Sequence, residues 1–305
     1  MLKIKLTNMR KLLIIAFACL LPAIMVCGIL FTGCKGQTKI KMYDVTTSKV
    51  ETLKLEDYVA GATAAEMDDS FALSALETQA ILCRTYAIYF KQNKLSKYKG
   101  ADISNDITEA QAYTNKVSNK IKQAVKNTSG KIITDQSGKT ILPYYCNNCG
   151  GKNSLASTVL GAKTDYIKQV ETGENEQNSK DFSWQASLTK ADILYAVRSL
   201  GGNLASVNSF KVNKTDSAGR ALEFNIGGIV VNANKFRLAV GSTIFKSCLI
   251  TNIAVSNTSV TFSGLGYGHG VGLSQHGANI LAQSNYTWDK IIGYYFSDVK
   301  IVTVK

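Results

Sequence analysis

The stretch LEDYVAGATAAEM, residues 55–67, carries the pattern on which the predicted fold depends. Leu55, Val59 and Ala62 recur at steps of three and four, which predicts a helix with one apolar face. One further step of four reaches Glu66, so a carboxylate is expected on the packed side near the helix C-terminus. Desolvation and the negative end of the helix dipole both disfavour its charged form. The resulting rise in pKa suits a general acid.

Two other fates for Glu66 stay open at this point: it turns to solvent, or it pairs with Arg84. Glycosidases are enzymes that need a general acid of this kind. Most of them use two carboxylates, and no second one stands out in this sequence. Glu77 lies one step from the apolar stripe of the next helix, and Glu109 opens a segment, 109–113, that would line a groove. A single-acid mechanism is open if the substrate supplies its own nucleophile.

Periodicity and turn signals on either side of this stretch predict an α+β protein with mixed helices and antiparallel strands. Such a protein could be built as two subdomains on either side of a groove. We expect a hairpin of 131–135 and 139–146, closed by Gln136-Ser137-Gly138, and irregular chain over 161–183. Helices are expected at 73–93 (with a one-sided apolar stripe), 115–127, 189–200, 273–283 and 288–296, and further strands at 39–45, 210–213, 221–226, 229–232, 249–256, 259–263 and 299–304.

The first 38 residues are predicted to be a membrane anchor and linker, separate from a folded region at 39–305. Four basic residues among the first eleven precede an uncharged run, 12–31, of the roughly 20 residues that span a bilayer. Positive charge ahead of the run predicts a cytoplasmic N-terminus. The run ends near Cys34 in a context similar to a lipoprotein cleavage site, so an uncleaved anchor and a lipidated cysteine are both open. Either one places 39–305 outside the cytoplasm.

The net charge is +13, and the five basic residues before residue 39 leave about +8 for the rest. Such a charge serves solubility or attracts a polyanion, which outside the cytoplasm would be the cell wall. No block of basic residues interleaved with aromatics is present, which argues against nucleic-acid binding.

A glycine-rich segment, Gly264 to Gly277, contains both histidines of the protein, His269 and His276. Glycine at alternate positions lets the backbone approach a ligand closely, and Ser274 and Gln275 add polar groups at an expected helix start. The alternative is a tight turn packed under another segment, with His269 hydrogen-bonded to backbone. The spacing fits no dinucleotide or P-loop motif.

Of the seven cysteines, Cys83 has helical apolar spacing and is expected in the core. Cys146 and Cys149 form a Cys-x-x-Cys pair, for which a disulfide, free thiols and a zinc site all stay open. Together with His269 and His276 they would make a four-ligand zinc site. The zinc site requires two distant segments to meet.

Four motifs occur in a characteristic order. They are Leu55–Gly61 leading to Ala65-Glu66-Met67; Leu76, Gln79-Ala80 and Arg84-Thr85-Tyr86-Ala87; the Gly150-Gly151 turn after a Tyr-rich strand; and Gly268–Gln275 followed by Gly277-Ala278. In these motifs the sequence resembles the stage II sporulation protein D family, which includes amidase-enhancer proteins. The resemblance covers most of the chain beyond the N-terminal segment.

This resemblance implies a peptidoglycan lytic transglycosylase that cuts between N-acetylmuramic acid and N-acetylglucosamine without a cofactor. The substrate's own 6-hydroxyl would be the nucleophile and leave a 1,6-anhydro ring, which would account for the missing second carboxylate. Glu66 matches the family's catalytic Glu. The matched motifs also suggest substrate contacts from Gln79, Arg84, Tyr86, His269, Ser274 and Gln275.

The family also implies a setting: glycan strands stripped of stem peptides, cut at the cell membrane in the space around the engulfed forespore, together with stage II sporulation proteins P and M. A non-catalytic module that stimulates a cell-wall amidase is the alternative. The sequence departs from the family at Asp68, which replaces a proline, at His276, which replaces an aromatic, and at the two paired cysteines.

Overall fold

The computed structural model describes residues 38–179 and 181–304, and residues 38–305 form one compact unit. The expected anchor at 12–31 and the alternative lipidation site Cys34 lie outside the described residues. Among the helices that are described, none is long and apolar enough to cross a bilayer.

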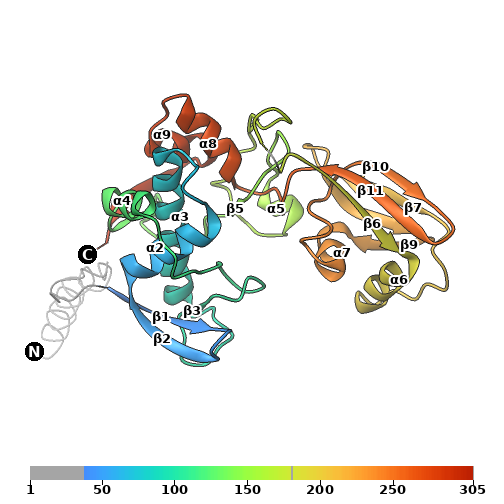
Figure 1. The fold of residues 1–305 in the computed structure, drawn as a ribbon, viewed down its shortest axis with the longest axis horizontal. Coiled ribbons are helices and arrows are strands. Elements are labelled where there is room, and N and C mark those ends of the chain that lie inside the picture. Colours follow the sequence, from blue (N-terminus) through green and yellow to red (C-terminus); the bar gives the residue numbers. More distant parts are fainter. Residues whose placement is uncertain (1–37, 180, 305) are drawn as a thin grey trace, which may run out of the picture. The chain divides into compact units, whose positions relative to one another are not determined.

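Eight helices and thirteen strands occur within the described ranges, and the sheets are mostly antiparallel, as the α+β prediction expected. Only β1 with β3 and β5 with β12 pair in parallel. In chain order (Figure 1) the elements are β1 (Lys39–Asp44), β2 (Lys49–Lys54), α2 (Leu55–Glu66), α3 (Leu73–Asn93), β3 (Ile103–Ser104), α4 (Asn119–Asn127), β4 (Lys131–Asp135), β5 (Tyr145–Cys146), α5 (Ala156–Val159), β6 (Ser183–Thr189), α6 (Lys190–Ser199), β7 (Phe210–Thr215), β8 (Ala221–Ile226), β9 (Ile229–Asn232), α7 (Ala233–Val240), β10 (Leu249–Val255), β11 (Ser259–Leu265), β12 (Leu273–Ser274), α8 (Gln275–Gln283), α9 (Trp288–Tyr295) and β13 (Val299–Thr303).

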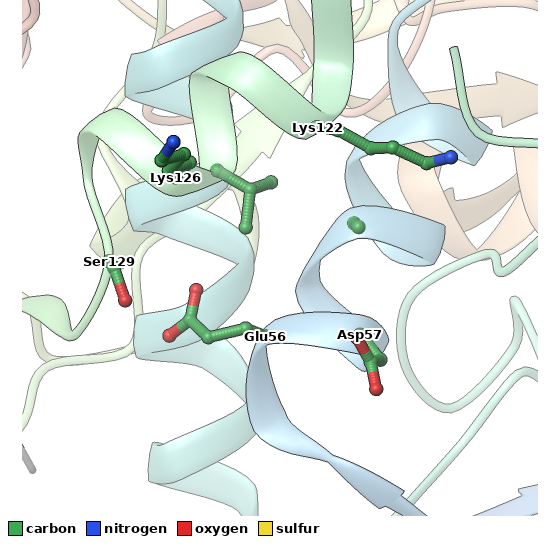
Figure 2. A pocket seen from close by; sticks show the side chains of 7 residues that line it. Glu56, Asp57, Lys122, Lys126 and Ser129 are labelled. Carbon is green, nitrogen blue, oxygen red and sulfur yellow. The ribbon is translucent and has the colours of Figure 1, made fainter. Parts of the chain in front are cut away.

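The helices α2 and α4 border a hollow of about 300 Å³. Figure 2 shows the side chains of Glu56, Asp57, Lys122, Lys126 and Ser129 around it. This hollow lies at the N-terminal end of α2, which places it ten residues from Glu66. At a rise of about 1.5 Å per residue, that separation is about 15 Å along the helix.

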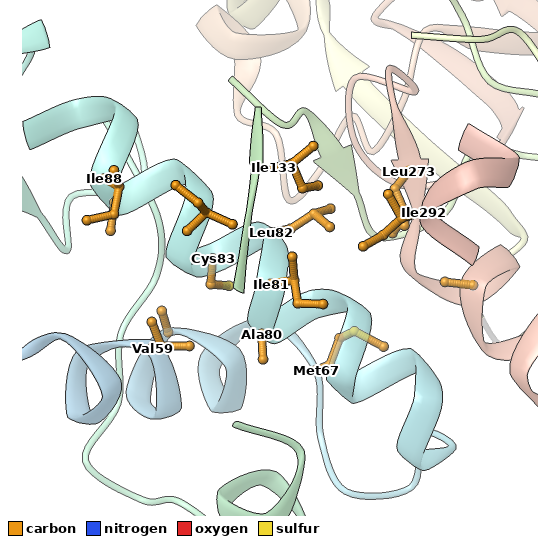
Figure 3. Packing of buried hydrophobic residues seen from close by; sticks show 14 of the residues in the cluster. Val59, Met67, Ala80, Ile81, Leu82, Cys83, Ile88, Ile133, Leu273 and Ile292 are labelled. Carbon is orange, nitrogen blue, oxygen red and sulfur yellow. The ribbon is translucent and has the colours of Figure 1, made fainter. Parts of the chain in front are cut away.

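Helix α3 forms the centre of the first hydrophobic core. Figure 3 shows side chains from α2, β4, β12 and α9 around it, among them Val59, Ile133, Leu273 and Ile292. Residues 75–85 of α3 are buried without a break. The buried surface of α3 is therefore wider than the expected one-sided apolar stripe, because neighbouring elements cover this part of the helix on all sides.

A second core lies between two antiparallel sheets, β10-β11-β6 and β7-β8-β9, and the helices α6 and α7. Five phenylalanines meet there with ring centroids 4.9–6.0 Å apart, namely Phe210, Phe224, Phe236, Phe245 and Phe262. Edge-to-face contacts of this kind stabilise a core beyond the area they bury.

The predicted hairpin after β4 holds only near its turn. Thr134 pairs with Thr140, and the amide of Asp135 donates to the Lys139 carbonyl at 2.8 Å. Beyond the turn the two segments separate, because β4 pairs with β13 and β5 pairs with β12. The expected second strand is thereby reduced to Tyr145–Cys146, which lies beside the segment that leads into α8.

Candidate active site

Glu66 is the last residue of α2, and the helix ends there because Met67 takes an extended conformation. Leu55, Val59 and Ala62 are buried on the same face, as the spacing predicted. The carboxylate is half-buried and accepts the Ala112 amide at 3.3 Å on Oε1. On Oε2 it accepts the Gln275 side-chain amide at 3.5 Å, a long contact.

Burial raises the pKa of Glu66, and hydrogen bonds from Ala112, Gln275 and Tyr145 oppose the rise. Because the desolvation is the largest cause, the protonated form is favoured relative to an exposed glutamate. No carboxylate of the described residues is among the groups that perturb this pKa. The two other carboxylates that the sequence left open have partners of their own: Glu77 accepts from Asn127, and Glu109 accepts from Ser104.

Three polar side chains form a hydrogen-bonded series that ends at Glu66. The Tyr58 hydroxyl donates to Gln111 Oε1 at 3.2 Å, and Gln111 Nε2 donates to the Tyr145 hydroxyl at 2.7 Å. Tyr145 in turn is one of the hydrogen-bond partners that lower the pKa of Glu66. Burial raises the pKa of both tyrosines, so both are neutral donors. Tyr145 and Tyr58 carried no signal of this role in the sequence, whereas Gln111 lies in the segment expected to line a groove.

Two of the expected substrate contacts lie inside the core. Arg84 is fully buried, and its guanidinium pairs with both carboxylate oxygens of Glu56 at 2.8 and 2.6 Å. A third bond reaches the Lys131 carbonyl at 3.1 Å, so Arg84 joins α2, α3 and β4 rather than pairing with Glu66. Gln79 is likewise fully buried and donates to Cys83 Sγ at 3.4 Å.

The remaining expected contacts differ in exposure. Tyr86 is half-buried, stacks on Phe90 at 4.7 Å, and has its pKa raised by burial and by nearby charges including Glu66. Ser274 is fully buried as the N-cap of α8, where it accepts the Gly277 amide at 3.3 Å and donates to Glu174. Gln275 is the one that reaches Glu66 directly.

The glycine-rich segment packs against the chain's own atoms. A Cβ at Gly272 would lie 2.0 Å from the Tyr144 carbonyl oxygen, and one at Gly270 would lie 2.1 Å from Arg220 Cζ. Both glycines have φ near +75°. This arrangement matches the tight-turn alternative, and the segment serves to place Gln275 beside Glu66.

His269 fits the same alternative. Its Nδ1 accepts the Val271 amide at 3.0 Å, and its ring meets Tyr144 edge-on at 6.2 Å. Burial, with the charges of Arg237 and Arg220, lowers the pKa of His269 to about 4. The ring is therefore neutral near pH 7, and its backbone contact leaves it as part of the loop's own packing.

The four residues of the suggested zinc site do not meet in one group. Cys146 and Cys149 are free thiols with their Sγ atoms 3.0 Å apart, and His269 is held by backbone. His276 Nε2 lies 3.9 Å from Asp181 and packs on Phe71. Within residues 38–179 and 181–304, no three His, Cys, Asp or Glu side chains are placed to hold a metal ion.

Two family models match successive stretches of this chain. Residues 43–134 match the family described as "Stage II sporulation protein", SpoIID, and residues 146–272 match a domain of unknown function, DUF8618. Stage II sporulation protein D of Bacillus subtilis is 25% identical over 279 residues, which cover 86% of this chain and 78% of that protein. The match of residues 43–134 and this likeness over most of the chain support the SpoIID family.

Two other relatives extend the comparison. An uncharacterized protein of Brachyspira hyodysenteriae is 28% identical over 262 residues, which are 85% of this chain and 70% of that protein. The amidase enhancer of B. subtilis is 26% identical over 283 residues, but these are 76% of this chain and only 38% of the enhancer. The SpoIID match contains Glu66 and all of α3, whereas the DUF8618 match runs from Cys146 to Gly272.

Proposed function

We propose that this SpoIID-family chain is a peptidoglycan lytic transglycosylase with Glu66 as its only acid and base. The observation that carries the proposal is a half-buried carboxyl group with a raised pKa, held by neutral donors and without a carboxylate neighbour among the described residues. A hydrolase of the usual type would need a second carboxylate in reach.

The proposed reaction begins with protonated Glu66. Its proton goes to the glycosidic oxygen between N-acetylmuramic acid and N-acetylglucosamine, and the C1–O bond breaks. The carboxylate then takes the proton from the muramic 6-hydroxyl while that oxygen bonds to C1. Glu66 ends protonated, the product carries a 1,6-anhydro ring, and no water is consumed. The step needs no cofactor.

The neighbours of Glu66 support both halves of this cycle. Burial raises the pKa of Glu66 and so favours the acid form that the first proton transfer needs. The Ala112 amide, Gln275 and Tyr145 donate to the carboxylate, so they stabilise the form that must act as the base.

The proposed setting follows from the family name, which points to sporulation. We place the protein at the cell membrane through its N-terminal segment, with residues 39–305 acting on wall glycans outside the cytoplasm, in the space around the engulfed forespore. Its partners there would be stage II sporulation proteins P and M, and its substrate glycan strands already stripped of stem peptides. It would have no nucleic-acid partner.

The second candidate is a non-catalytic module that stimulates a cell-wall amidase. The match to the amidase enhancer favours it. Such a module would bind murein without cutting it, and it would have no use for a carboxyl group with a raised pKa.

Product analysis separates the candidates. The purified full-length chain is incubated with murein, with and without stem peptides, in water enriched in ¹⁸O, and the released fragments are weighed by mass spectrometry. We expect anhydro-muramic ends, lighter than hydrolysis products by one water and free of ¹⁸O, with faster release from stripped glycan. Intact glycan would favour the enhancer, and ¹⁸O at the new end would show a hydrolase.

A further inference from the structure

The turn from Cys146 to Cys149 places two buried thiols side by side, and the proposed reaction does not use them. Cys146 retains 5% of its surface and Cys149 none, and the two Sγ atoms lie 3.0 Å apart. A disulfide needs about 2.05 Å, so a shift of about 1 Å would bring the sulfurs into bonding range.

This turn connects two of the segments that hold Glu66. On one side Cys146 ends β5, whose Tyr145 belongs to the hydrogen-bonded series at the carboxylate. On the other side the Cys149 amide donates to Ser274 Oγ at 3.3 Å, and the His276 amide donates to the Asn147 carbonyl at 3.1 Å. The turn therefore contacts both flanks of Gln275.

We propose that Cys146 and Cys149 form a disulfide bond that fastens this turn and so holds Tyr145 and Gln275 against Glu66. The bond would be a modification site, formed by exchange with an organic disulfide. The bond would matter to the site because the turn contacts both β5, which carries Tyr145, and the start of α8, which carries Gln275. Without the bond, both segments would be held less firmly.

The exchange balances as follows. The Cys146 thiolate attacks one sulfur of the organic disulfide, forms a mixed disulfide and releases one thiol. The Cys149 thiolate then attacks the Cys146 sulfur, closes the bond and releases the second thiol. Two protons pass from the cysteines to the released thiols, the protein loses two electrons, and the organic disulfide gains them.

The surroundings favour Cys146 as the entry point, since it is the one with exposed surface. Gly268 lies over it, and a Cβ there would come within 2.7 Å of Cys146 Cβ, so the absence of a side chain leaves room. Arg220 Nη2 donates to the Cys149 carbonyl at 2.8 Å and so holds the second cysteine of the turn in place.

The first test maps the bond directly. The full-length chain is equilibrated with glutathione disulfide, denatured, alkylated and cut with trypsin, which releases Thr140–Lys152 with only these two cysteines. We expect this peptide to be unalkylated and two hydrogens lighter, and to take two alkyl groups after reduction. The peptide that contains Cys248 serves as the alkylation control.

Several outcomes of this mapping would overturn the proposal. They are two alkylated cysteines without reduction, bonds to other chains instead of a bond within the turn, or thiols that become reactive only after a chelator removes bound zinc. None of these depends on catalysis.

The second test asks whether the bond holds the site, and only its activity readout rests on the proposed function. We expect reduction to lower the release of anhydro sugars several-fold and the melting temperature by a few degrees. The double variant Cys146→Ser/Cys149→Ser should resemble the reduced protein and ignore the reductant, whereas Cys248→Ser should respond like the natural chain.

An unchanged rate and melting temperature on reduction would overturn the fastening role. If the chain releases no anhydro sugar in either state, the proposed function fails. The peptide mapping and the melting temperature then still decide whether the disulfide forms and stabilises the turn.

Discussion

Two opposing effects determine the pKa of the Glu66 carboxyl group. Burial raises its pKa, and donors from three different segments, at Ala112, Tyr145 and Gln275, lower it again. Because the proposed first step uses the acid form, activity should fall as pH rises through this pKa. Any change that removes a donor should move the fall to higher pH, and any change that admits water should move it lower.

Tyr145→Phe tests the nearest donor. We expect the alkaline limb of the pH–rate profile to shift to higher pH, because the carboxylate loses a hydrogen bond. Gln111 also loses its acceptor, so the free energy of unfolding should fall by about 1–3 kcal/mol. Tyr195→Phe, on an exposed surface of α6, is the matched control and should change neither quantity. A profile that stays in place, or moves to lower pH, would contradict the assigned role of Tyr145.

Arg84→Met tests whether this arginine is structural. Its bonds to Glu56 and Lys131 are internal, and the Glu56 side chain is 36% exposed and can be rehydrated. We expect a loss of roughly 1.5–3 kcal/mol in unfolding free energy, typical of hydrogen bonds to charged groups. The KM of the folded fraction should stay unchanged, and Arg198→Met at an exposed site should cost little. A large rise in KM without loss of stability would restore Arg84 to the substrate site.

At the scale of elements, much of α2, α3, α4, α6, α8 and α9 could be predicted, because local periodicity and caps determine them. The capping box at Thr189 and Asp192 is one such signal. The pairing of β5 with β12 could not, since it joins residues more than 120 positions apart. For the same reason the contact of Tyr145 with Glu66 could not be predicted, whereas the place of Glu66 on the packed face of α2 follows from helical spacing alone.

Gly272→Ala tests the packing of the glycine-rich segment. An alanine Cβ there would lie 2.0 Å from the Tyr144 carbonyl oxygen in a backbone with φ +75°. Left-handed strain alone costs roughly 1–2 kcal/mol. Gly228→Ala measures that part, because its φ is +94° and nothing lies within 4 Å. We expect Gly272→Ala to lose clearly more unfolding free energy than Gly228→Ala and to reduce activity. Equal losses would show that the close approach does not constrain the segment.

For the molecule as a whole, two hydrophobic cores carry separate parts of the proposed machinery. The first packs α2, which ends at Glu66, against α3, and both helices lie in the range that matches SpoIID. The second includes β8, and Arg220, the residue before that strand, lies against Gly270 of the glycine-rich segment, in the range that matches DUF8618. The composition of the chain outside residues 1–38 also leaves it with a charge of about +8.

This charge should make murein binding depend on salt, since screening shortens electrostatic reach to about 8 Å at physiological ionic strength. We expect the affinity of the full-length chain for insoluble murein to fall between low and high salt, measured by sedimentation. Murein stripped of its anionic polymers should show a weaker salt dependence. Equal binding at all salt concentrations would show that the positive charge serves solubility alone.

The role of Glu66 is tested by the rate at which the Glu66→Gln variant releases anhydro-muramic products from stripped glycan. The substitution keeps the size of the side chain and removes its titratable proton. We expect the rate to fall by about 10²–10⁴-fold, the usual contribution of a general acid. Murein binding should persist, and thermal stability above neutral pH should match or exceed that of the natural chain, because the fold disfavours the ionised form. Glu176→Gln, at an exposed position, should keep full activity. Near-normal product release by Glu66→Gln would show that Glu66 is not the acid and base of the reaction.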